Sequence, residues 1–200
     1  MKWNRAVQHV ADLAGACADM DTRPAAIFPL RVVGLWVAGE LLGPPRDVET
    51  ALVALEVDVP EVPWLTEPKG AAHWGQAVRL PQLPLTVRWR SAHAPVWNHV
   101  LDRPVPVWTR AGGVDEGALA ALRDGEGERV RPAERGDVAQ RVAEELGISH
   151  RALSASTDEY RERRYKPGKL EPVADALWRA AEGYLDLVSA QAERSWSDQV

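Results

Sequence analysis

The stretch from Leu30 to Asp58, LRVVGLWVAGELLGPPRDVETALVALEVD, carries the pattern from which we predict the fold. An apolar run reaches a small turn at Gly39, a loop rich in glycine and proline follows, and a second apolar run covers residues 50–58. Near-continuous apolar runs of this length are typical of strands that are buried on both faces of a sheet. Two acidic residues, Asp47 and Glu49, stand just before the second run. We therefore predict a strand, a glycine turn, a short loop with an acidic pair, and a second strand.

The residues on either side of this stretch predict helices and further strands. Residues 1–20 repeat apolar side chains every three or four positions, which indicates an amphipathic helix. Residues 84–90 alternate apolar and polar side chains, as a half-buried strand does. The prolines in residues 104–109 suit a short edge strand. We expect residues 1–112 to form a domain with a mixed sheet and helices.

The chain after residue 112 shows no further strand-like run, and we expect residues 113–200 to form a helical domain. Residues 125–136 are charged and poor in apolar side chains, which is typical of a linker. The predicted fold class is therefore α+β, with an N-terminal mixed sheet with helices followed by a C-terminal helical bundle.

Capping residues predict where the C-terminal helices begin and end. Asp137 is a good N-cap for a helix that ends at Gly147, and Ser149 is suited to cap the next one. Pro172 fits the first turn of a long last helix. The core face that we predict for this last helix consists of Val173, Leu177, Trp178, Ala181, Leu185 and Val188.

The composition excludes several classes of protein. The net charge is −5, whereas proteins that wrap a nucleic acid backbone usually present a basic face. Cys17 is the only cysteine, so an intrachain disulfide and a cysteine-based metal site are excluded. No stretch approaches about 18 uninterrupted apolar residues, and the N-terminus lacks the apolar core of a secretory signal. We expect a cytoplasmic protein without a membrane span.

The layout of residues 30–58 resembles the minimal nucleotidyltransferase family. In that family a strand ends in a Gly-Ser turn, and an acid-x-acid pair opens the next strand and holds divalent metal ions. By position, the resemblance assigns Gly39 to the turn and Asp47 and Glu49 to the first two metal ligands. It implies Mg²⁺ and a nucleoside triphosphate as ligands if the site is functional.

Three departures from the family pattern lead us to expect a degenerate catalytic site. Glu40 stands where the family has serine, and its carboxylate would repel a triphosphate. The loop to Asp47 is short, and residues 84–90 offer arginines in place of a third acid. We expect a binding or regulatory role for this fold, with active nucleotidyl transfer by Asp47 and Glu49 as the alternative.

Residues 138–156 resemble the helix-turn-helix signature, which makes a DNA binder a second alternative. Gly147 would lie in the turn, and His150, Arg151 and Ser154 would face the groove. The acidic charge of the chain disfavours nucleic acid as a partner.

A basic cluster follows, made of Arg161, Arg163, Arg164, Lys166 and Lys169. It is a candidate surface for a phosphate or an acidic partner. Alternatively, it is a solvated helix end whose cations complement the helix dipole. The sequence leaves open whether the partner is a protein or a nucleotide.

The chain as a whole resembles an uncharacterised family of proteins from GC-rich bacteria. The phrases GLWVAGELLGPPRD, VPWLTEP, APVWNH and KPGKLEPVADALWRAAEGYLDL carry this resemblance, which covers nearly the full length. It implies no activity.

Overall fold

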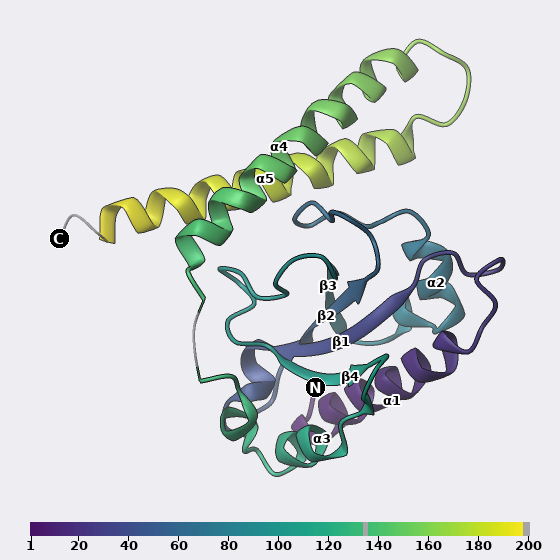
Figure 1. The fold of residues 1–200 in the computed structure, drawn as a ribbon. Coiled ribbons are helices and arrows are strands. Elements are labelled where there is room, and N and C mark those ends of the chain that lie inside the picture. Colours follow the sequence, from purple (N-terminus) through teal and green to yellow (C-terminus); the bar gives the residue numbers. More distant parts are fainter. Residues whose placement is uncertain (134–135, 198–200) are drawn as a thin grey trace. The chain divides into compact units, whose positions relative to one another are not determined.

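The computed structural model of this protein describes residues 1–133 and 136–197, and these residues form two compact units (Figure 1). The first unit contains residues 1–60 and 68–133, and the second contains residues 61–67 together with the helices after residue 136. We predicted the division after residue 112, whereas residues 113–133 stay with the sheet. The seven residues 61–67 leave the first unit and return to it.

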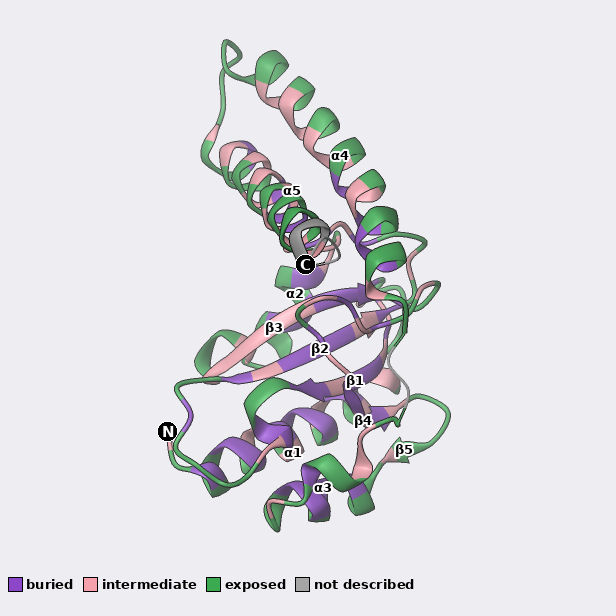
Figure 2. Ribbon diagram, turned by 90° about the vertical axis from the view of Figure 1, so that its left-hand side faces the viewer, coloured by how far each residue is buried: buried purple, intermediate pink, exposed green. Residues whose placement is uncertain are grey.

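The predicted N-terminal helix is confirmed as α1, which spans Trp3–Asp21. The apolar stripe predicted for it is buried in full and consists of Trp3, Ala6, Val7, Val10, Leu13, Ala14, Cys17 and Met20. α1 packs against the strands of the sheet and against α3, and Figure 2 shows buried stretches along this helix. Burying each large side chain of the stripe contributes about 1.5–3 kcal/mol of hydrophobic free energy.

The sheet of the first unit has five strands in the order β3-β2-β1-β4-β5. Their bounds are Val32–Ala38 for β1, Ala51–Val57 for β2, Leu85–Ser91 for β3, Val105–Thr109 for β4 and Gly113–Val114 for β5. β2 and β3 run parallel, whereas the other neighbours are antiparallel. The predicted mixed sheet is therefore confirmed, and the two apolar runs of residues 30–58 form its central strands.

The prediction that residues 104–109 form an edge strand is wrong. β4 lies between β1 and β5, and β5 pairs only with Trp108 and Thr109. Pro106 can occupy this strand because no residue of β5 is paired opposite it. β5 was not predicted, since a two-residue strand has no periodic pattern.

Two further helices belong to the first unit, α2 (Ala71–Ala77) and α3 (Glu116–Arg123). Asp115 caps α3 by accepting a hydrogen bond from the Ala118 backbone N–H. The 3₁₀ turns η1, η2 and η3 span Gly39–Leu42, Leu80–Gln82 and Gly127–Val130.

The segment predicted as a linker is packed onto the first unit in its described part. A Cβ atom on Gly127 would lie 2.8 Å from the Leu42 Cα atom, so only glycine allows this approach. Glu128 accepts hydrogen bonds of 2.6 Å from both Arg131 and Arg103. The hydrogen bond from Arg131, followed by that from Arg103, lowers the pKa of the Glu128 carboxyl. The close contact at Gly127 and these ion pairs hold the segment against the first unit, although its polar composition suggested a solvated linker.

The second unit is built on two long helices, α4 (Val138–Arg163) and α5 (Glu171–Ser197), which pack against each other as a hairpin (Figure 1). The predicted C-terminal helical part is therefore confirmed, and its bundle consists of two helices. None of the helices in the described parts of the chain combines the length and the apolar character that a membrane crossing requires.

Candidate functional site

The residues of the predicted nucleotide site lie around the turn and loop between β1 and β2. Gly39 has a φ of +69°, which explains why glycine occupies this turn. Asp47 and Glu49 lie in the loop before β2, and both are exposed. Val48 between them is buried, and its backbone N–H and C=O both pair with the backbone of Met1. The two acids thus stand on either side of an anchored residue.

Within the described residues, no group of three histidine, cysteine or acidic side chains is placed to hold a metal ion. Glu40 forms an ion pair with Arg46 at 2.9 Å, and Leu41 and Leu42 turn into the core. The nucleotide site at Gly39, Asp47 and Glu49 stays a prediction.

The helix-turn-helix interpretation of residues 138–156 is wrong. α4 is one continuous helix, and Gly147 lies inside it without a turn. Ser149 does not cap a second helix, because it is buried on α4 and its hydroxyl accepts a hydrogen bond from the Trp64 backbone N–H. A glycine inside a helix costs roughly 1 kcal/mol relative to alanine, and packing of the whole helix outweighs this cost.

The basic cluster lies at the end of α4 and in the turn that follows, and all of its members are exposed. Arg161 pairs with Asp158, Lys166 pairs with Glu162, and the Arg164 guanidinium lies 4.7 Å from the centre of the Tyr165 ring. The two ion pairs partly neutralise the cluster. Its role as an anion or partner patch, with Arg163 as a further member, stays a prediction.

The segment 61–67 is bound by both helices of the hairpin. The Trp64 side chain is buried, and its indole Nε1–H donates a 2.7 Å hydrogen bond to Asp186 on α5. Two ion pairs flank it, Glu61 with Arg151 at 2.8 Å and Glu67 with Arg179 at 2.9 Å. The segment is therefore packed against the middle part of both helices.

The core face that we predicted for the last helix is wrong in its larger side chains. Trp178, Leu185 and Val188 are exposed by 64%, 61% and 38%. The buried face of α5 instead carries Val173, Ala180, Gly183 and Leu187. The prediction failed because α5 has two apolar stripes that are offset by one residue, and only one of them is covered.

The outer face of α5 is defined here as Ala174, Trp178, Ala181, Leu185 and Val188. These residues follow the alternating spacing of four and three that coiled-coil seams use. Figure 2 shows exposed positions along the outer sides of both hairpin helices. The apolar residues of α5 extend over more of its circumference than a single neighbouring helix can cover. This width is the signal that would have identified the outer face from the sequence.

Acidic side chains border the outer face. Asp175 and Glu182 each follow a seam alanine, and both are exposed. The outer face is thus an apolar seam with exposed carboxylates along one side.

A family model described as a domain of unknown function (DUF7711) matches residues 1–193. The chain belongs to this family. The match confirms the resemblance to an uncharacterised family, and it means that a DUF7711 domain comprises both the sheet unit and the hairpin. No curated protein and no solved structure matches the chain.

Proposed function

We propose that this protein works by binding a partner protein, and that the outer face of α5 receives an amphipathic helix of that partner. The observation that carries the proposal is the exposure of Trp178, Leu185 and Val188 on a helix whose other face is already packed. Contiguous apolar patches on soluble proteins commonly mark interaction sites. The role is one of binding, in line with the expectation from the degenerate nucleotidyltransferase motif.

The spacing of the outer face supports a helix as the bound element. Trp178 and Leu185 are two turns apart, and Ala174 and Ala181 leave room beside them. Large side chains alternating with alanine let the large residues of a second helix enter the gaps. Trp178 is the expected anchor, because tryptophan is enriched among residues that dominate binding energy.

The charge of the border supports a partner with basic flanks. Asp175 and Glu182 would face lysine or arginine at the edges of the docked helix. In an antiparallel pair of two copies of α5, the same acids would face each other and repel. A partner helix with an apolar face and basic flanks therefore fits better than a second copy of this chain.

Two labelled peptides test this proposal. Each is an 18-residue helix with leucine at the seam positions, and the flanks are lysine in one and glutamate in the other. We expect fluorescence anisotropy to show saturable binding of the lysine peptide alone. Leu185→Glu should abolish that binding although it makes the protein more acidic, so a loss cannot come from weaker overall charge attraction.

Tyr165→Ser serves as the matched control, because Tyr165 is a large exposed residue of the hairpin outside the seam. Equal binding to the wild type and to Leu185→Glu would overturn the proposal. Sedimentation velocity tests for self-association. If the wild type self-associates and Leu185→Glu does not, the partner at the outer face is a second copy of this chain, and the proposal of a basic partner helix is wrong.

The nucleotidyltransferase alternative keeps a separate test. Calorimetry with ATP and GTP, with and without Mg²⁺, on the wild type and Asp47→Ala would detect metal-dependent binding. Such binding, lost in Asp47→Ala, would assign a nucleotide role to Gly39, Asp47 and Glu49 beside the docking role. The cytoplasmic location and the bacterial origin also stay predictions.

A further inference from the structure

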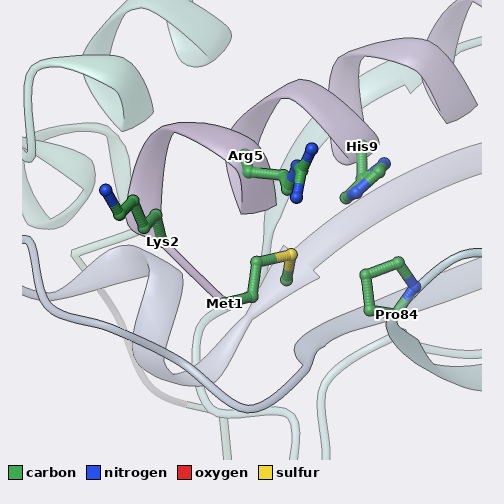
Figure 3. Close-up of a pocket in the computed structure, with 5 residues that line it drawn as sticks. All are labelled: Met1, Lys2, Arg5, His9 and Pro84. Carbon is green, nitrogen blue, oxygen red and sulfur yellow. The ribbon is translucent and has the colours of Figure 1, made fainter.

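A pocket of about 470 Å³ lies at the start of α1, in the first unit. Its lining residues are Met1, Lys2, Arg5, His9 and Pro84 (Figure 3). The volume lies within the range of small-molecule sites, which is roughly 300–1,000 Å³. Neither the nucleotide prediction nor the docking surface uses this pocket.

Basic side chains supply the polar part of the lining. Arg5 and His9 are one turn apart on α1, and Figure 3 shows the Arg5 side chain extending toward the His9 ring. The Lys2 amine points away from them, so it contributes charge at longer range. Among the described residues, neither Lys2 nor Arg5 makes an ion pair.

His9 has an unused polar atom. Its Nδ1 atom is buried, and within the described part of the chain it has no hydrogen-bond partner. Because Nδ1 has almost no accessible surface, the ring nitrogen that a ligand in the pocket can reach is Nε2.

The backbone adds to the positive potential. The first turn of α1 contains no acidic residue, and no side chain caps it. Acidic side chains normally offset the positive end of the helix dipole there, whereas this helix places Lys2 and Arg5 at that end. An anion in the pocket would relieve this unfavourable arrangement.

Carboxylates also lie nearby. Asp47 and Glu49 flank Val48, whose backbone pairs with Met1, but neither acid lines the pocket. They reduce the attraction for a bare anion. A ligand that also contacts the apolar side chains of Met1 and Pro84 is therefore favoured over a free ion.

We propose that this pocket binds the phosphate group of a small phosphate monoester. The Arg5 guanidinium makes paired hydrogen bonds to the phosphate oxygens, and His9 donates a further one. The organic part of the ester lies against Met1 and Pro84.

Phenyl phosphate, inorganic phosphate and malonate are the probes, added to the full-length protein with any purification tag at the carboxyl end. Two-dimensional NMR follows the backbone amides of Trp3 and Asn4 and the ring of His9. We expect saturable shifts with phenyl phosphate at millimolar concentration and weaker binding of inorganic phosphate. Arg5→Gln should weaken phenyl phosphate binding about tenfold, because it removes a charged hydrogen-bond donor.

Arg123→Gln is the matched control, since Arg123 is also an exposed helical arginine and its loss changes the net charge equally. Equal weakening in both variants would mean general charge attraction and would overturn the site. Absence of saturable shifts with both phosphates would overturn it as well. Tighter binding of malonate than of phenyl phosphate would overturn the assignment to phosphate. His9→Gln provides a second variant, and unchanged binding there would remove His9 from the site.

Discussion

Gly183 lies inside α5 and Gly147 lies inside α4. The two positions differ in whether there is space for the methyl group of an alanine. A Cβ atom on Gly183 would overlap the Trp64 carbonyl oxygen of the bound segment. A Cβ atom on Gly147 would lie 3.8 Å from the nearest atom, the Arg151 Nη1, which is an ordinary contact. Gly183 is therefore required for packing, whereas Gly147 only weakens its helix.

Substitution of each glycine by alanine should change stability in opposite directions. Gly183→Ala is expected to lower the free energy of unfolding by about 1–3 kcal/mol, because the segment must shift. Gly147→Ala is expected to raise it by about 0.5–1 kcal/mol through helix propensity. Urea denaturation followed by circular dichroism measures both. A loss of stability in Gly147→Ala would contradict the continuous α4 helix.

Cys17 lies on the buried stripe of α1, with an exposed fraction of 1%. Burial raises the pKa of the Cys17 thiol, because the thiolate would lose its hydration. Since the thiolate is the reactive form, we expect native protein at pH 8 to resist Ellman's reagent and unfolded protein to react fully. Rapid reaction of the native protein would mean that α1 opens from the sheet.

The helical hairpin depends on an element that is not a helix. The segment 61–67 comes from between β2 and α2, yet Trp64 bonds to Ser149 on α4 and to Asp186 on α5. Two ion pairs at its ends, with Arg151 and Arg179, fix its direction. The hairpin therefore obtains part of its core from a strand connection.

Truncation of the central side chain tests this dependence. Trp64→Ala should lower the free energy of unfolding by about 3–5 kcal/mol, because it empties the site of a buried indole. Trp64→Phe keeps an aromatic ring and loses the donor to Asp186, so its effect should be smaller. Thermal unfolding of the two variants ranks them. Equal and small effects would show that the segment is not a working part of the core.

The chain passes between its two units three times, at residues 60–61, at residues 67–68 and between residues 133 and 136. A cut after residue 133 would therefore remove α4 and α5 but leave their bound segment behind. Trp64 would then lose the contacts that bury it.

A chain ending at residue 133 should bind the dye ANS more strongly than the full-length protein does. The same truncated chain with Trp64→Ser should bind less of the dye, because the exposed indole is gone. Circular dichroism of both truncated chains checks that the sheet unit is folded. Identical dye binding by the two would contradict the assignment of segment 61–67 to the hairpin.

The α+β class and the main strands could be predicted because their signal is local. All eight residues of the α1 stripe are buried as their spacing indicates, and both apolar runs of residues 30–58 became the central strands. α1 has one apolar face, and the two central strands are apolar on both faces. The pattern therefore decides without ambiguity which of their side chains are buried. Periodicity then suffices, since burial of apolar surface drives the packing.

The candidate site could not be predicted in the same way. Trp178, Leu185 and Val188 form as good a core stripe in sequence as Val173, Ala180 and Leu187. A stripe shows which side chains are apolar. It does not show whether they are covered, because the neighbour that covers them comes from elsewhere in the chain. For α5 that neighbour includes Trp64, 122 residues before Asp186. The sequence by itself determined the α+β class, α1, the main strands and the family. Only the tertiary structure decided that α4 is continuous and which face of α5 is covered, because both depend on contacts with residues far away in the chain.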